Sequence, residues 1–218
     1  MKILVDVPAY NEANAITSVL VALRSNKYDI LVVYDGSSDA TGDVARAHGV
    51  SVVRHLFNRG LGAALRTGFA YAVDHDYDAV ITLDADGQHS PVEISRFCAA
   101  LDRGADVVIG QRERSAMPLI RQIYTACGAL VTSGLFGGPL IDSQSGFRAL
   151  RCSVLKKFNL TTSRMEISSE ILAEAHRVGA SVEQVPISVK YTQYSMSKGQ
   201  GFFEGMRTMW RLLLKSFS

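Results

Sequence analysis

The run Ala79–Leu83 is followed directly by Asp84-Ala85-Asp86-Gly87, and this junction of an apolar segment with two acids constrains the chain most. The run has the length and β-branched content of a buried strand. Residues two apart on an extended chain face the same way, so the carboxylates of Asp84 and Asp86 point to one spot. Two carboxylates held that close repel unless a cation lies between them. Together with the amide of Gln88, these oxygen ligands suit Mg2+ or Mn2+, which commonly bind substrate phosphates as well. The sequence therefore predicts a metal and diphosphate site at the end of a strand, with Asp84, Asp86 and Gln88 as metal ligands.

Strand-like and helix-like segments alternate through the first half of the chain. The expected strands are Lys2–Val7, Ile30–Tyr34, Val50–His55, Ala79–Leu83 and Ala105–Ile109, and the expected helices are Glu12–Ser25, Asp39–Gly49, Leu61–Val73 and Pro91–Leu101. Continuous Val/Ile/Leu strands separated by helices indicate a mainly parallel sheet covered on both faces. Ligands of such sheets bind beyond the carboxyl ends of the strands. The Pro8–Glu12 segment, Asp35, Asp84 and Asp86 all fall at such ends.

The second half is less regular. We expect strands at Gly146–Arg151 and Ser181–Val189, a helix at Ser168–Val178 and a last helix over Phe202–Phe217. The last helix is amphipathic, with Trp210 on its apolar face and a row of basic residues on another face. This pattern is typical of an interfacial membrane helix, and equally of a helix that covers the domain core.

The composition is that of a soluble globular protein. Of its 218 residues, 47% are hydrophobic and 20% are charged, and the net charge of +2 is too small to indicate nucleic-acid binding. Cys98, Cys127 and Cys152 lie far apart without metal-ligand spacing, which predicts reduced thiols in a cytosolic protein.

Neither apolar stretch of note is expected to cross a membrane. Asp6 and Pro8 interrupt the N-terminal run, so no signal-peptide core is present. The uncharged stretch Ile123–Ile141 should break at Gly137-Gly138-Pro139. The remaining helix would be about 21 Å long at about 1.5 Å per residue, which is short of a hydrocarbon core of about 30 Å. We expect a buried or membrane-adjacent helix there.

Several further residues are candidates for phosphate or nucleoside contacts. Arg112, Arg121 and Lys198 form a set that could hold a second phosphate, because arginine forks match phosphate oxygens. The turn Asn58–Gly62 opens a helix whose free N–H groups could also hold a phosphate. Asp35 either accepts hydrogen bonds from a base or ribose, or simply belongs to a capped turn. The histidines, His89 included, show no ligand pattern.

A series of short motifs in a specific order resembles the family 2 glycosyltransferases, and within them the dolichyl-phosphate mannose synthase-like branch. The motifs are Val7-Pro8-Ala9-Tyr10-Asn11-Glu12, Asp35-Gly36-Ser37-Ser38-Asp39, Gly60-Leu61-Gly62-Ala63-Ala64, Asp84-Ala85-Asp86-Gly87-Gln88-His89-Ser90-Pro91, Asp142, Ser145-Gly146-Phe147-Arg148, Val185-Pro186-Ile187 and Ser197-Lys198. The resemblance covers nearly the whole chain. A haloacid-dehalogenase-type phosphatase, which also uses an Asp-x-Asp motif, fits poorly because that motif belongs on an early strand and here lies on the fourth.

The resemblance implies an α/β GT-A fold, with a Rossmann-like, mainly parallel central sheet, helices on both faces and a C-terminal amphipathic helix. Residues 1–200 would form one domain, with a nucleotide-sugar half at 1–110 and an acceptor half at 111–200, followed by the helix at 201–218. The implied enzyme is an inverting, Mg2+- or Mn2+-dependent hexosyltransferase that moves a sugar from GDP-mannose or a UDP-hexose to a polyprenyl phosphate. It would be cytoplasmic and peripheral on the membrane.

The resemblance also assigns roles to individual residues. The donor contacts are Pro8, Tyr10, Glu12, Asp35, Asp84, Ala85 and Asp86; the acceptor-phosphate contacts are Arg112, Arg121, Thr125 and Lys198; and Asp86, Arg112 and Arg121 are the catalytic residues. An ionised phosphate acceptor needs no general base, whereas a hydroxyl acceptor would need a carboxylate, and neither Glu166 nor Glu170 is followed by the expected Asp. A transferase that extends a glycan hydroxyl, and a non-catalytic nucleotide-sugar-binding subunit, are the alternatives. Residues Thr192–Met196 lack the usual arginine and Tyr34 replaces the first of two usual aspartates, so the donor base and sugar stay open.

Overall fold

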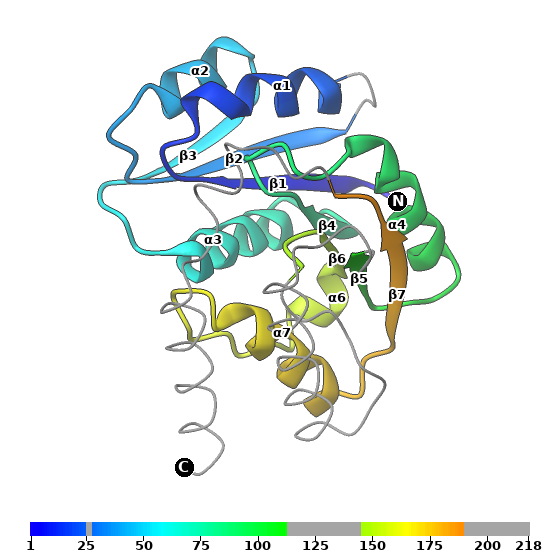
Figure 1. The fold of residues 1–218 in the computed structure, drawn as a ribbon. Helices are drawn as coiled ribbons and strands as arrows, with labels where there is room; N and C mark the ends of the chain where they lie inside the picture. Colours follow the sequence, from blue (N-terminus) through cyan, green and yellow to red (C-terminus); the bar gives the residue numbers. More distant parts are fainter. Residues whose placement is uncertain (25–27, 113–144, 190–218) are drawn as a thin grey trace, which may run out of the picture.

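The computed structural model describes residues 1–24, 28–112 and 145–189 (Figure 1). The strands are β1 (Ile3–Ala9), β2 (Asp29–Asp35), β3 (Ser51–His55), β4 (Ala79–Thr82), β5 (Val107–Arg112), β6 (Arg148–Arg151) and β7 (Val182–Ile187). The helices are α1 (Ala13–Arg24), α2 (Thr41–Ala47), α3 (Leu61–Asp74), the 3-10 turn η1 (Pro91–Glu93), α4 (Ile94–Asp102), α6 (Cys152–Leu155) and α7 (Ile167–Arg177). The predicted α/β alternation is confirmed.

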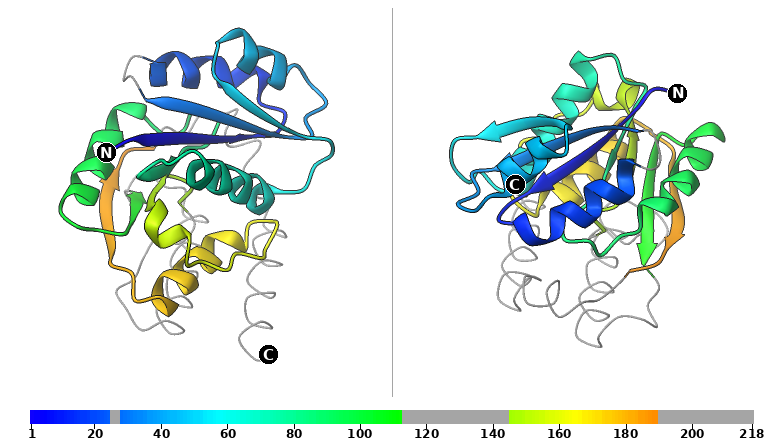
Figure 2. Two further views of the ribbon diagram at one scale, coloured as in Figure 1. Left: turned by 180° about the vertical axis from the view of Figure 1, so that it is seen from behind. Right: turned by 90° about the horizontal axis from the view of Figure 1, so that it is seen from above.

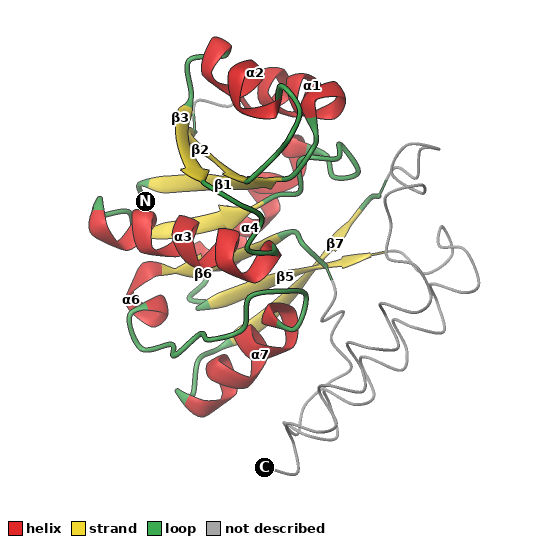
Figure 3. Cartoon of the chain, turned by 90° about the vertical axis from the view of Figure 1, so that its left-hand side faces the viewer, coloured by secondary structure: helices red, strands yellow, loops and turns green. Residues whose placement is uncertain are grey.

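These strands form one sheet in the order β3-β2-β1-β4-β6-β5-β7, which can be followed in Figure 3. The pairs β1–β2, β1–β4, β2–β3 and β5–β7 are parallel, as the sequence predicts. Strand β6 is the exception, because it runs antiparallel between β4 and β5. Its first residue, Arg148, is paired with Thr82 near the end of β4 and with Ile109 of β5. The start of β6 therefore lies at the edge where the parallel strands end, which we call the carboxyl edge.

Helices cover both faces of the sheet (Figure 2). Alternate residues of each strand enter different cores, as period-two side-chain geometry requires. On β1, Val5 and Val7 pack in the core that includes buried residues of α1 and α4, whereas Leu4 packs in the core that includes α3 and α7. Burial on both faces explains why the strands are continuous apolar runs.

Some predicted boundaries are wrong in ways that long-range pairing explains. Strand β5 continues past Ile109 to Arg112, because β7 pairs with it as far as Arg112 and Ile187. The strand expected from Gly146 begins at Arg148. The helix expected from Pro91 begins as η1, and the short helix α6 was not predicted.

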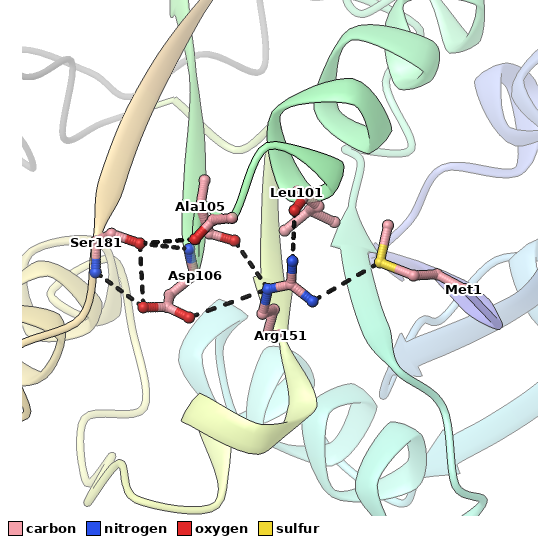
Figure 4. Close-up of polar contacts among 7 residues, drawn as sticks. Met1, Leu101, Ala105, Asp106, Arg151 and Ser181 are labelled. Carbon is pink, nitrogen blue, oxygen red and sulfur yellow. Dashed lines mark hydrogen bonds and ion pairs between the residues drawn. The ribbon is translucent and has the colours of Figure 1, made fainter.

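A polar cluster ties β5, β6 and β7 together at the opposite edge of the sheet (Figure 4). The guanidinium of Arg151, at the end of β6, donates to the carbonyl oxygens of Ala105 (3.0 Å) and Leu101. Asp106 accepts hydrogen bonds from the backbone amide (2.9 Å) and the hydroxyl (3.1 Å) of Ser181. These contacts are structural, because they satisfy backbone groups far from the carboxyl edge.

Asp6 is a carboxyl group inside the apolar core between β1 and α3. It is fully buried, and neither carboxyl oxygen has a hydrogen-bond partner among the described residues. Its carboxyl lies against Gly68 of α3, where a Cβ atom would come within 2.1 Å of Oδ2. Burial raises the pKa of Asp6 well above its ordinary value, so the fold favours the neutral acid.

The stretch Ile123–Ile141 and the predicted helix Phe202–Phe217 lie outside the described residues. Among the helices within the described ranges, none is long and apolar enough to cross a bilayer.

Candidate active site

Asp84 and Asp86 follow β4 directly and lie at the carboxyl edge, as predicted. The side chain of Asp84 is about one-third exposed, at 36%. Its carboxylate rests on the backbone of Gly146, just before β6, where a Cβ atom would come within 2.2 Å of Oδ2. Glycine at position 146 therefore leaves room for the Asp84 carboxylate, which a side chain at this position would displace.

The electrostatics of this edge are those of an acidic centre with basic neighbours. Burial raises the pKa of Asp84, the charges of Arg148 and Arg112 lower it, and Glu12 raises it again. Burial and the charge of Asp84 raise the pKa of Asp86. Neighbouring carboxylates whose pKa values are raised in this way gain from a bound cation, so the donor set fits Mg2+ or Mn2+.

Gln88 lies beside Asp86, as the sequence predicts. Its backbone amide donates to Oδ1 of Asp86 at 3.0 Å, and its side-chain amide donates to Oδ2. Within the described ranges, no three His, Cys, Asp or Glu side chains are grouped to hold a metal. Gln88 is a candidate third ligand beside the two carboxylates, because its amide oxygen is a donor that hard ions accept.

Arg148 is a basic residue of this site to which we assigned no role from the sequence. It is only 2% exposed on the central strand β6, and its charge lowers the pKa of Asp84. Buried charges need compensation, and Asp84 supplies it. The available signal was the Ser-Gly-Phe-Arg motif, in which an arginine opens an otherwise apolar strand.

His89, which shows no ligand pattern in the sequence, also lies beside the acidic pair. Its Nε2 atom lies 3.8 Å from Oδ2 of Asp84, and its charge lowers the pKa of Asp86. The ring is buried against Phe147 at a centroid distance of 5.4 Å. Its backbone forms an antiparallel bridge with Val189, just after β7.

The end of β1 and the loop after it carry three of the predicted nucleoside contacts, Pro8, Tyr10 and Glu12. Pro8 is buried, whereas Tyr10 is 48% exposed. Several hydrogen bonds fix this loop to the segment from the end of β2 to the start of α2. Among them, the amide of Glu12 donates to the Thr41 hydroxyl (2.9 Å), and Asn11 Oδ1 accepts from the Ser38 amide (2.8 Å). Glu12 is thereby held close enough to Asp84 to raise its pKa.

Asp35 ends β2 and is buried, with its carboxylate bound by protein groups. It accepts hydrogen bonds from the amides of Arg59 (2.9 Å) and Gly60 (2.6 Å) and lies 2.6 Å from Nδ1 of His55. Two amides of the Asn58–Gly62 turn therefore bind Asp35 and are not available to a phosphate.

Glu170, considered above as a base for a hydroxyl acceptor, has a structural position in α7. Its two carboxylate oxygens accept hydrogen bonds from the hydroxyls and the backbone amides of Thr161 and Thr162. Burial raises the pKa of Glu170, but these hydrogen bonds outweigh it and lower the pKa overall. An acid held in its charged form by four hydrogen bonds is a poor general base.

The structure thus brings Glu12, Asp84, Asp86, Gln88 and Arg112 to one edge of the sheet. Arg121, Thr125, Asp142 and Lys198 lie outside the described residues.

Known proteins resemble this chain along most of its length. The profile of glycosyl transferase family 2 matches residues 5–158. The UDP-N-acetylglucosamine–dolichyl-phosphate N-acetylglucosaminyltransferase of Methanococcus voltae is 32% identical, over 95% of this chain and 93% of the relative. The undecaprenyl-phosphate mannosyltransferase of Micrococcus luteus is 30% identical, over 94% of this chain and 90% of the relative.

A solved structure gives the same fold. Glucosyl-3-phosphoglycerate synthase of Mycobacterium tuberculosis, crystallised with Mn2+, UDP-glucose and phosphoglyceric acid, superposes with a TM-score of 0.76 at 18% identity, over 99% of this chain and 79% of that one. The GT-A fold expected from the sequence is confirmed. The chain belongs to glycosyl transferase family 2 and is a glycosyltransferase.

Proposed function

We propose that this enzyme transfers a hexose from a nucleoside diphosphate sugar to a polyprenyl phosphate, with inversion at the anomeric carbon. The observation that carries the proposal is the acidic pair Asp84 and Asp86 at the carboxyl edge, with raised pKa values and with Arg112 beside it. The names of the relatives from Methanococcus voltae and Micrococcus luteus support a polyprenyl or dolichyl phosphate acceptor.

Asp84, Asp86 and Gln88 would hold Mg2+ or Mn2+ at the donor diphosphate. The ion, when bound, supplies charge neutralisation to the departing nucleoside diphosphate. Arg148 and His89 keep the two carboxylates in place from the buried side of the site. Pro8, Tyr10 and Asp35 would contact the nucleoside, with Glu12 between them and the metal ligands.

The acceptor chemistry follows from the charge of a phosphate. A phosphate monoester is ionised near neutral pH, since its second pKa is about 6. Its oxygen can attack directly, so the protein has only to orient it opposite the leaving group. Arg112, at the end of β5, is suited to this role, and we include Arg121, Thr125 and Lys198 in the same phosphate site. Glu170, with its oxygens already hydrogen-bonded, supports an acceptor that needs no base.

We also propose that residues Phe202–Ser218 bind the cytoplasmic face of the membrane, where a polyprenyl phosphate is found. The segment combines aromatic and basic residues, a combination that favours anionic lipid surfaces. Deletion of Phe202–Ser218 should abolish sedimentation with anionic liposomes, and retained binding would refute this part of the proposal.

The reaction is tested with purified protein, Mn2+, a polyprenyl phosphate and a panel of radiolabelled GDP- and UDP-sugars. We expect label from one donor to enter the organic phase, and Asp86→Ala to abolish it. Label that enters a saccharide acceptor but no lipid would contradict the phosphate acceptor. Donor binding without any transfer would indicate a non-catalytic binding subunit instead.

A further inference from the structure

His55, the last residue of β3, lies buried between Asp35 and α3. Its Nδ1 atom is 2.6 Å from Oδ1 of Asp35, and its Nε2 atom is 2.9 Å from the hydroxyl of Thr67. That hydroxyl donates to the carbonyl oxygen of Ala63 at 3.0 Å. The ring therefore connects a predicted nucleoside contact to the first turns of α3.

The hydrogens of this chain of contacts can be counted. On the far side of the ring, Nε2 of His55 shares a hydrogen bond with the hydroxyl of Thr67. On the near side, an ionised carboxylate only accepts, so Nδ1 must carry the hydrogen of the contact with Asp35. A charge-assisted hydrogen bond of this kind fixes geometry more firmly than a neutral one.

The same counting limits what Asp35 can still bind. A carboxylate has about four acceptor positions. Oδ1 accepts from His55 and from the amide of Arg59, and Oδ2 accepts from the amide of Gly60. Within the described ranges no other hydrogen bond to Oδ2 is formed, so these residues leave it capacity for one more. Oδ2 can therefore accept a hydrogen bond from a single N–H group, such as the imide of a nucleobase. It cannot bind a base that presents only a hydrogen-bond acceptor to it.

We propose that His55 is the positioning residue of the nucleobase site: it orients Asp35 so that one carboxylate oxygen is available to an N–H donor of the base. This inference rests on the proposed function, because it takes Asp35 as a donor contact. Its consequence is specific. Loss of the His55 contact should weaken the base-dependent part of nucleotide binding and leave the diphosphate part unchanged.

Variants at His55 separate these two parts of the binding. His55→Leu removes both ring contacts. His55→Asn keeps an N–H near the place of Nδ1 and loses only the contact with Thr67. Thr67→Val is the matched control, because it removes the hydrogen bond on the far side of the ring and leaves Asp35 untouched. The probes are UDP, GDP and the base-free ribose 5-diphosphate, each titrated with Mn2+ by calorimetry.

We expect His55→Leu to weaken binding of the preferred nucleoside diphosphate about tenfold or more, the scale of a lost charged hydrogen bond. Ribose 5-diphosphate should bind within about twofold of wild type, and His55→Asn should restore most of the loss. An equal loss for both probes would mean a merely structural role and overturn the inference. An unchanged preference for the base would overturn it as well.

A measurement on the wild-type chain covers the case in which His55→Leu does not fold. In 15N-correlated NMR at pH 7, Nδ1 of His55 should carry a hydrogen that is donated to Asp35, and a ring with its only hydrogen on Nε2 would overturn the inference. Addition of the preferred nucleotide should shift the ring nitrogen signals, whereas ribose 5-diphosphate should not. A wild-type protein that binds no nucleoside diphosphate would refute the proposed function itself, an outcome distinct from binding that is insensitive to His55.

Discussion

Gly146 supports the carboxylate of Asp84: a Cβ atom at position 146 would lie within 2.2 Å of Oδ2 and 2.6 Å of Cγ. The two residues belong to segments that meet only because β6 is paired with β4. A methyl group at position 146 must displace the carboxylate or the chain that opens β6.

We therefore expect Gly146→Ala to weaken Mn2+ binding by about tenfold or more, because a metal site tolerates little displacement of its ligands. The measurement is calorimetric titration of Mn2+ with UDP present. Gly179→Ala is the control, since Gly179 has a positive φ of 68° but no atom near the added methyl group. That variant should lose stability and keep its Mn2+ affinity. Equal Mn2+ affinity in Gly146→Ala and wild type would contradict the close contact.

Arg148 and Arg151 lie on the same short strand and allow a matched comparison. Arg148→Met removes the buried charge that lowers the pKa of Asp84, so more of Asp84 is protonated and Mn2+ affinity near neutral pH should fall. Arg151→Met loses the contacts to Ala105 and Leu101 and should lower the melting temperature without changing Mn2+ affinity (Figure 4). The prediction fails if both variants change Mn2+ affinity to the same extent.

Asp6 should make the folded state less stable as the pH rises. Its pKa is raised by burial, so between the ordinary pKa of about 3.9 and the folded value the native state binds more protons than the unfolded state. Stability contributed by the neutral acid is therefore present at low pH and is lost as the pH rises through the folded pKa.

Asp6→Val removes this buried acid and places an apolar side chain in the apolar core. We expect its melting temperature at pH 7 to exceed that of wild type by at least about 3 °C, as about 1 kcal/mol shifts a chain of this size by roughly 2–4 °C. Asp6→Asn keeps a polar group without ionisation and should show a flatter dependence of melting temperature on pH. If the melting temperatures of Asp6→Asn and wild type depend on pH in the same way between pH 5 and 8, the raised pKa of Asp6 is contradicted.

The ionisation of Glu170 changes the stability of the fold with pH in the opposite direction to that of Asp6. Its folded pKa is lowered overall, so it stabilises the fold above its unfolded pKa of about 4.3, and this stabilisation is lost as the pH falls through the folded value. Glu170→Gln should have a lower melting temperature at pH 7, and the difference from wild type should shrink below about pH 4. Sugar transfer per folded molecule should be unchanged; a large loss would restore Glu170 as a catalytic base.

Much of this architecture can be predicted from local sequence. The continuous apolar strands and their intervening helices predict the sheet, and the two-residue spacing of Asp84 and Asp86 predicts that both acids face one site. What could not be predicted depends on pairing between distant segments. Nothing local indicates that β6 enters between β4 and β5, so the approach of Arg148 to Asp84 was missed. The hydrogen bonds of Asp35 were missed for the same reason, because they come from the end of β3 and the start of α3.

The antiparallel direction of β6 determines where the connection from β5 to β6 begins and ends. Strand β5 ends at Arg112 on the carboxyl edge, and β6 starts at Arg148 on the same edge. Both ends of the connection between these strands therefore lie at one edge of the sheet, beside the acidic pair. A connection that begins and ends at the same edge can differ in length between relatives while every strand keeps its register, so that the proposed acceptor site can change without any change in the proposed donor site.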